Sequence, residues 1–231
     1  IVVPDSVSEI GKSVFSSTGI KSFTLGKGID SISESMFSSC SDLTDIKIPA
    51  HIKKIGKYAF TGINIHSVEL PEGLAEIDAR AFVFNPDADY DTKVVLPLSL
   101  RKLNEGSFYG VKHIVVTTDD NGMLPRNLFS AIGRDNDSSK RISTKLTVDG
   151  KDYIIPFVGV NLSKWDEYLK MIPFSEDVIW NIYHNIDDME PSLFRKFLIE
   201  LYPTIDNPNV KTEIGKKLRS LQRSIFKMCL P

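Results

Sequence analysis

The sequence predicts a β/α solenoid of short strands and short helical turns, followed by a small all-α helical domain. Three observations support this prediction. A phenylalanine recurs every 21 to 26 residues, at Phe15, Phe37, Phe60, Phe82, Phe108 and Phe129. An isoleucine or leucine stands five residues before each of them. After about residue 157 the apolar spacing changes from that of strands to that of helices. A period near 22 residues is typical of one supersecondary unit per solenoid coil.

The clearest repeat unit is KIPAHIKKIGKYAFTG, residues 47–62. The stretch LTDIKI, residues 43–48, alternates apolar and polar side chains as a strand does, and Pro49 ends it. The spacing of Ile55, Ala59 and Phe60 then predicts one short helical turn that places apolar groups on one side. Each coil is therefore expected to bury its isoleucine and phenylalanine against the coils on either side.

Two segments interrupt or end the repeats. An insertion at residues 84–93 carries Asp87, Asp89 and Asp91. We interpret it as a solvated acidic loop rather than a calcium site, because the glycine and the final glutamate of a calcium loop are missing. Residues 145–157 predict a β-hairpin that turns at Asp149-Gly150. We expect this hairpin to close the end of the solenoid.

Four helices are expected after the repeats. They are predicted at residues 163–172 with Ser163 as N-cap, from Ser175 to about 187, at 190–202 and at 209–228. Together they suggest a small bundle. We therefore divide the chain into a solenoid with its terminal hairpin, residues 1–156, and a C-terminal helical bundle, residues 157–231.

Composition excludes several classes of protein. The 231 residues are 42% hydrophobic, carry a formal net charge of −2 and contain two cysteines. That balance argues against a wholly nucleic-acid-binding protein, and no apolar run is long enough for a membrane span. Because the chain begins inside a repeat with no signal peptide, we expect it to be part of something longer.

Catalytic and cofactor motifs are missing from the sequence. Gly11-Lys12-Ser13 resembles the end of a phosphate-binding loop, but Ser6 stands where the first glycine is required. The same slot holds Gly56-Lys57-Tyr58 in the third unit, so the motif is an instance of the repeat. We therefore predict no enzyme activity, no catalytic residues, no cofactor and no metal. His66 and His113, at related strand positions, are interpreted as exposed residues of the sheet face.

The repeat pattern resembles the leucine-rich repeats of the BspA-like family. The likeness is clearest in SSCSDLTDIKIPAHIKKIGKYAF and LPEGLAEIDARAF and covers roughly residues 1–130, extending at most to 156. The resemblance implies a leucine-rich-repeat solenoid and a surface-exposed or host-associated binding protein, although such repeats are also implied for some intracellular and viral proteins. The missing N-terminal cap, the insertion in the fourth unit and the helical tail depart from the family pattern.

Two surfaces are candidates for partner binding. The first is the outward row of side chains on the repeat strands: Thr24, Asp45, Lys47, Ser67, Glu69, Lys93, Val95, His113 and Val115. The second is the basic last helix, with Lys216, Lys217, Arg219, Arg223 and Lys227. This helix either docks to an acidic partner, nucleic acid or an anionic membrane, or is an amphipathic bundle helix with a solvated basic face.

We therefore expect a non-enzymatic module that binds a protein, or alternatively a glycan, through its sheet face. The alternative is a structural component of a virion or cell envelope that docks through the helical tail. Nucleic acid is not an expected partner. The resemblance favours the cell surface or secretion over an intracellular or virion-associated location. The sequence makes no prediction of oligomeric state.

Overall fold

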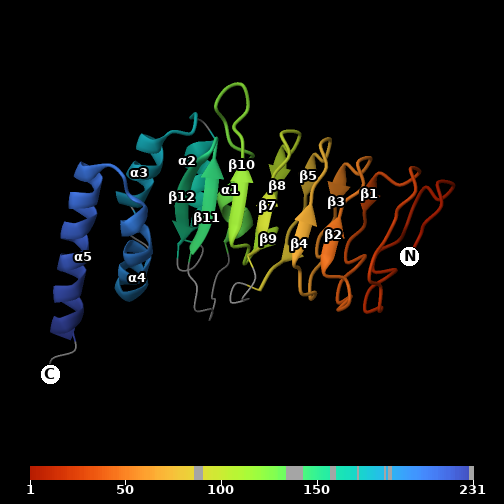
Figure 1. Ribbon diagram of the computed structural model, residues 1–231, viewed down its shortest axis with the longest axis horizontal. Helices are drawn as coiled ribbons and strands as arrows, with labels where there is room; N and C mark the ends of the chain where they lie inside the picture. The colour runs from red at the N-terminus through yellow and green to blue at the C-terminus, as the bar shows by residue number, and fades with distance from the viewer. Residues whose placement is uncertain are drawn as a thin grey trace.

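The computed structural model describes residues 1–85, 91–133, 143–156, 160–170, 172–184, 186 and 189–228, with side chains of the last helix described to Leu221. The chain forms a parallel β-solenoid that runs from the N-terminus to a hairpin, and helices follow at the far end (Figure 1). The expected solenoid is therefore confirmed.

The short strands of the coils lie in three strips along the solenoid, and the described coils do not all contribute to each strip. The first strip holds β2 (Asp45–Lys47), β4 (Ser67–Glu69), β7 (Lys93–Val95) and β10 (His113–Val116). The second holds β1 (Ser31–Ile32), β3 (Lys54–Ile55), β5 (Glu76–Ile77) and β8 (Lys102–Leu103). The third holds β6 (Phe82–Val83) and β9 (Phe108–Tyr109). Lys54 pairs with Glu76, and Glu76 pairs with Lys102, so the sequence period is also the register of the strips.

The recurring phenylalanines form a continuous stack through the core. Adjacent ring centroids from Phe15 to Phe108 lie 5.6, 5.4, 5.1 and 5.5 Å apart. The planes of Phe60 and Phe82 differ by 6°, and Phe60 is fully buried. Such offset pairs add about 0.5–1.5 kcal/mol to the stabilisation from burial alone.

The short helical turn expected before each phenylalanine is wrong for most of the repeats. Two residues before the phenylalanine the backbone is left-handed, with φ of 55° at Ser35, 57° at Tyr58 and 52° at Arg80. A residue with positive φ cannot continue a right-handed helix. The segment therefore turns sharply, and a helix, α1 (Leu128–Ile132), follows this position in the coil of Phe129.

Close stacking of the coils explains the glycine of the repeat unit. A Cβ added to Gly56 would lie 2.8 Å from the carbonyl oxygen of Ile32 in the preceding coil. That distance is too short for a carbon atom, so the glycine serves packing and not phosphate binding.

The hairpin expected after the repeats is present and extends the first strip. Strand β11 (Ser143–Val148) pairs in parallel with β10, and β12 (Lys151–Pro156) pairs antiparallel with β11. Asp149 and Gly150 form its turn with positive φ, as the sequence predicts. The antiparallel strand ends the parallel series, so the hairpin closes this strip.

Four α-helices follow the hairpin: α2 (Leu162–Leu169), α3 (Glu176–His184), α4 (Pro191–Leu201) and α5 (Pro208–Met228), with a 3₁₀ turn η1 (Tyr202–Thr204) before α5. Ser163 is not the N-cap of α2, because Asn161 holds that position and its side chain makes no capping bond. Ser175 accepts a hydrogen bond from the Val178 N–H at 3.3 Å, as a residue preceding α3 should. Glu190 caps α4.

The helices pack directly on the end of the solenoid. The Tyr183 hydroxyl donates to the Ile154 carbonyl at 2.6 Å, and the Trp165 ring lies 5.7 Å from that of Phe129. One hydrophobic core runs from Val3 to Ile214. The proposed boundary at residue 157 itself lies outside the described residues. Within the described chain, no helix combines the length and apolar character that crossing a membrane requires.

Candidate functional site

The outward side chains of the first strip lie in two rows, because strand register aligns every second residue. Asp45 pairs with Ser67 and Lys47 with Glu69. Farther along, Lys93 pairs with His113, and Val95 with Val115. Thr24 is bridged to Val2 in the first coil and lies at the N-terminal side of the rows.

Sequence reasoning missed that the hairpin continues both rows. Lys145 is the register partner of His113, and Thr147 is the partner of Val115. On the antiparallel strand Asp152 lies opposite Thr147. The alternating pattern of residues 143–148 was a usable signal, because a strand that pairs in parallel with β10 must place Lys145 and Thr147 outward.

The half of this face on β2 and β4 neutralises its own charges. Lys47 and Glu69 form an ion pair at 2.9 Å. The Ser67 hydroxyl donates to Asp45 at 2.6 Å, and this bond, with that from Thr44, lowers the pKa of the Asp45 carboxyl. An exposed pair of this kind contributes about 0–1 kcal/mol. The charged side chains of β2 and β4 are therefore already bound to groups on the neighbouring strand.

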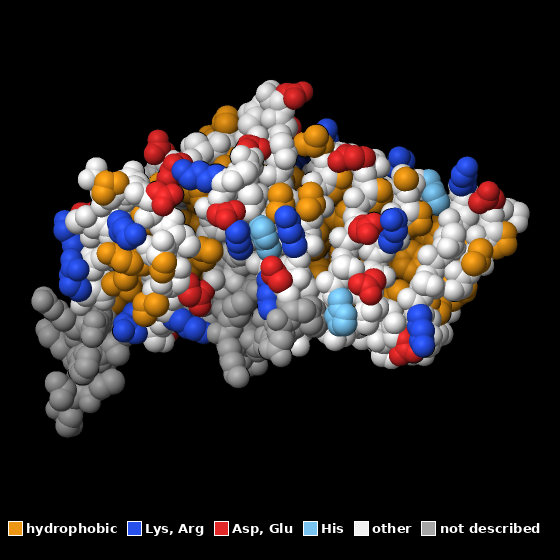
Figure 2. Space-filling view, viewed as in Figure 1, with side chains coloured by type: hydrophobic (Ala, Val, Ile, Leu, Met, Phe, Trp, Pro, Cys, Tyr) orange, Lys and Arg blue, Asp and Glu red, His pale blue; other side chains and the backbone are white. Residues whose placement is uncertain are grey.

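The other half, on β7, β10 and β11, has a different character. We name the set Lys93, Val95, His113, Val115 and Lys145 the β7–β11 patch. The Lys93 ammonium has no hydrogen-bond or ion-pair partner in the described part of the chain, whereas Lys145 pairs with Asp152 at 2.6 Å. Val95 is 55% exposed and Val115 is half-buried. An unpaired basic group therefore lies beside an accessible apolar spot, and Figure 2 shows basic, histidine and apolar groups gathered near the centre of this face.

His113 lies between two lysines in the middle of the patch. Its Nε2 atom is 2.7 Å from the Thr147 hydroxyl. Partial burial lowers the pKa of His113, and the charges of Lys145 and Lys93 lower it further. The imidazole is therefore mainly neutral at pH 7, and Lys93 carries the unpaired positive charge of the row, because Lys145 is paired with Asp152. His113 is half-buried rather than fully exposed as expected.

The sheet face is not continuous. No ladder joins β4 to β7, nor the strand around Phe23 to β2, in the described chain. Beside the second break lies a groove of about 390 Å³ whose walls include Phe23, Ile48 and Leu70. Figure 2 shows apolar surface between the strands there. The face is therefore divided into separate segments, and the β7–β11 patch belongs to the one that includes the hairpin.

Metal binding gains no support from these side chains. No group of three or more His, Cys, Asp or Glu suited to a metal ion occurs among the described residues. His66 directly precedes β4, whereas His113 is the first residue of β10, so the two histidines do not hold the same position in their strands. Asp87 and Asp89 of the acidic insertion lie outside the described residues.

The basic face of α5 is partly engaged by its own chain. Lys216 pairs with Glu213 at 2.7 Å. The Lys217 ammonium lies 4.8 Å from the centre of the Phe194 ring, and that of Lys211 lies 5.3 Å from the Tyr202 ring. Arg219 is exposed. The side chains of Arg223 and Lys227 lie outside the described residues.

A stacked parallel solenoid with an outward row of strand residues defines the class of leucine-rich-repeat proteins. More particularly, residues 1–89 match the family model of the BspA type leucine rich repeat region, in six copies. The structure continues the same register beyond residue 89, to the bridge between Lys102 and Arg126. Repeats of this family generally act as non-enzymatic interaction modules.

Comparison with solved structures found a leucine-rich repeat protein from Bacteroides ovatus ATCC 8483. It is 20% identical over 58% of this chain, with a TM-score of 0.44. The match spans 36% of that protein's chain. No curated protein matches the sequence.

Proposed function

We propose that this protein is a non-enzymatic binding module that takes a protein partner on the β7–β11 patch. The single observation that carries the proposal is an exposed apolar side chain, Val95, beside Lys93, whose ammonium has no ion-pair partner among the described residues. A partner segment that carries acidic and apolar side chains at alternate positions matches this arrangement. Such a segment would lie extended across the strands.

Physical considerations favour this half of the face over its neighbour. An unpaired lysine attracts an acidic partner without first breaking an internal ion pair, whereas Lys47 must give up Glu69. Exposed Val95 and half-buried Val115 supply apolar area to be removed from water, at roughly 25 cal/mol per Å². The basic charge would then serve orientation and association rate, and the valines affinity.

The alternative of a structural component that docks through the helical tail draws less support. Lys211 and Lys217 already lie over aromatic rings of the same chain, and Lys216 is paired. These contacts agree with α5 acting as a packed helix with a partly solvated basic face. A glycan partner also gains less support, because the exposed apolar area of Val95 favours a partner that carries apolar side chains.

The experiment selects peptide ligands from a displayed random library and measures their affinities by fluorescence polarisation. Val95→Asp and Lys93→Glu should each weaken binding of the selected acidic and apolar peptides by about tenfold or more. Lys47→Ala is the matched control on β2 and should change affinity less than about twofold. Equal binding by the wild type and by both patch variants would contradict the proposal. Equal losses in the control variant would move the site to the β2–β4 half.

A further inference from the structure

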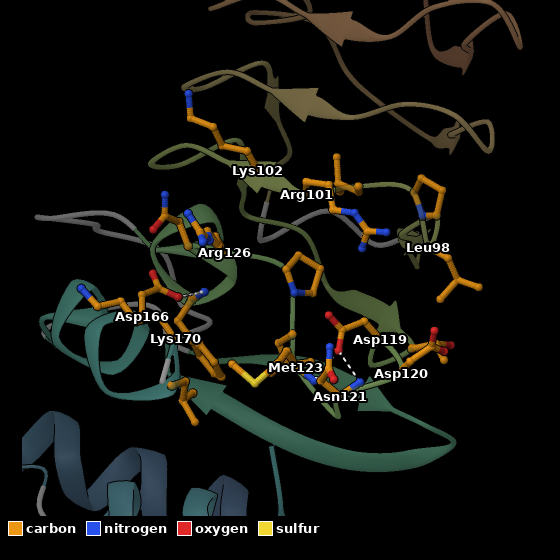
Figure 3. Close-up of a pocket in the computed structure, with 18 residues that line it drawn as sticks. Leu98, Arg101, Lys102, Asp119, Asp120, Asn121, Met123, Arg126, Asp166 and Lys170 are labelled. Carbon is orange, nitrogen blue, oxygen red and sulfur yellow. Dashed lines mark hydrogen bonds between the residues drawn. The ribbon is translucent and has the colours of Figure 1, made fainter. Parts of the chain in front are cut away.

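A second concave site lies where the last coils meet helix α2, away from the outward rows. The cavity has a volume of about 620 Å³, within the range of small-molecule sites. One wall is the coil side with Arg101 and Arg126, and another is the segment around Asp119. Helix α2 contributes Asp166 and Lys170 (Figure 3). We name this space the junction cleft.

The acidic groups of the junction cleft hold its walls in place. Asp166 accepts hydrogen bonds from the backbone N–H groups of Phe129 and Ser130, at 2.9 and 2.8 Å. Asp119 accepts from the N–H groups of Asn121 and Met123, at 2.9 and 3.0 Å. Both carboxylates are thus committed to backbone donors, and burial raises the pKa of Asp166 despite those bonds.

Neighbouring elements fix the same walls. The Phe174 N–H donates to the Gly122 carbonyl at 2.9 Å, and a Cβ on Gly122 would press on Pro173 at 3.2 Å. The Thr118 N–H and hydroxyl both donate to Asp149 in the hairpin turn, at 3.0 and 2.8 Å. The cleft is therefore formed before any ligand arrives, which reduces the entropy lost on binding.

Of the basic side chains that line the junction cleft, some form ion pairs with carboxylates and others do not. Lys102 pairs with Glu76 at 2.9 Å and is directed away from the cleft, and Lys170 pairs with Glu167 (Figure 3). The guanidinium groups of Arg101 and Arg126 have no hydrogen-bond or ion-pair partner among the described residues. Figure 3 shows Arg101 directed into the space that faces Asp119. Two unsatisfied guanidinium groups thus border a preformed cavity.

We propose that the junction cleft binds a small ligand that carries phosphate or carboxylate groups, held by Arg101 and Arg126. A guanidinium group matches both oxyanions with parallel N–H donors, and such charge-assisted bonds are stronger than neutral ones. Leu98, which is 56% exposed, and half-buried Met123 line the cavity and offer apolar surface to the rest of the ligand. Of the acidic lining residues, exposed Asp120 accepts no backbone hydrogen bond within the described part of the chain, and it would disfavour anions that approach from its side. This site is independent of the β7–β11 patch.

Isothermal titration of the full chain at physiological salt, with pyrophosphate in one arm and citrate in the other, tests the proposal. At least one anion should bind saturably with one site per chain. Arg101→Gln and Arg126→Gln should each weaken that binding by about tenfold, as expected for loss of a charge-assisted bond. Arg219→Gln, an exposed arginine on α5, is the matched control and should bind as the wild type does.

The outcomes distinguish the two ligand sources. Binding of pyrophosphate alone assigns a phosphate ligand, and binding of citrate alone assigns a carboxylate. Saturable binding of neither anion overturns the proposal, as does equal binding by wild type and by the cleft variants. Circular dichroism of the variants checks folding, which both exposed positions should leave unchanged.

Discussion

The coils of the solenoid and the helices that follow it are held in place by different kinds of contact. Between coils the same contacts recur: a stacked phenylalanine, a buried isoleucine and parallel strand pairs one period apart. Between the solenoid and the helices the contacts are individual, such as Asp166 on the N–H groups that open α1. The stabilising contacts are therefore spread over all the coils of the solenoid, whereas a few individual contacts hold the helices against it.

The largest expected effect comes from breaking the phenylalanine stack. Phe60→Ala removes a fully buried ring between two stacked neighbours and should lower the free energy of unfolding by about 3–5 kcal/mol. Phe15→Ala, where the ring is half-buried in the first coil, should cost less. Urea denaturation of the two variants measures the difference. Equal losses would show that stability is not distributed by coil position.

A second prediction tests the individual contacts that hold the helices against the solenoid. Asp166→Ala leaves two N–H groups without their acceptor and should cost about 1–3 kcal/mol. Hydrogen exchange should quicken at Phe129, Ser130 and the helices, while β3 and β5 keep their protection. Glu167→Ala, at the exposed neighbouring position, is the control. Faster exchange throughout the solenoid would contradict the comparison.

The variant Arg80→Gly tests whether the left-handed backbone of the repeat turn is strained. A non-glycine residue at φ of 52° is strained by roughly 1 kcal/mol, and glycine removes that strain. We expect the variant to be more stable by up to about 1 kcal/mol, seen as a higher thermal midpoint. Arg101→Gly, an exposed position at which no positive φ occurs, should instead be neutral or destabilising. A loss of stability in Arg80→Gly would mean that the arginine side chain contributes more than the strain.

The smallest effect concerns pH and the sheet face. The pKa of His113 is lower in the folded chain than the ordinary value near 6.5, so the unfolded chain binds more protons. Stability should therefore fall slightly as the pH drops below about 6.5. His113→Gln removes this contribution, and comparing urea midpoints of both proteins at pH 8 and pH 5.5 measures it. An identical pH dependence in the variant would contradict the assignment to His113.

Sequence alone was sufficient for the solenoid, because a phenylalanine every 22 or so residues leaves few other ways to bury it. It was also sufficient for the hairpin, since Asp149-Gly150 favours a tight turn. The sequence-based prediction of a helical turn failed at the second residue before the phenylalanine, where the backbone is left-handed. Ser35, Tyr58 and Arg80 are not residues that favour left-handed backbone, so coil stacking overrides their local preference.

The candidate sites were less predictable. The period of the repeats predicted the two outward rows of side chains on the sheet face. It did not predict which side chains within a row form ion pairs. That Lys47 is bound to Glu69 while Lys93 is unpaired depends on which residue the neighbouring coil places opposite. The junction cleft joins Arg101 to Asp166 across 65 positions of sequence, and no periodic pattern connects a repeat to a helix. The prediction of Ser163 as N-cap was wrong for a local reason, because helix α2 has its N-cap at Asn161, two residues earlier than the capping preference of Ser163 indicates.

The register of the coils also bears on how such a chain changes in length. Lys54 and Glu76 are strand partners, so excising residues 54–75 would join Lys53 to Glu76 at an equivalent point of the coil. The shortened chain would keep its strips, its stack of rings and its hairpin. A change of a few residues within one coil must instead be absorbed by the turns of that coil, as happens in the fourth unit, where Glu76 still pairs with Lys102 across 26 positions. Whole-coil duplication or loss therefore leaves every turn as it is, whereas a small insertion or deletion remodels one turn.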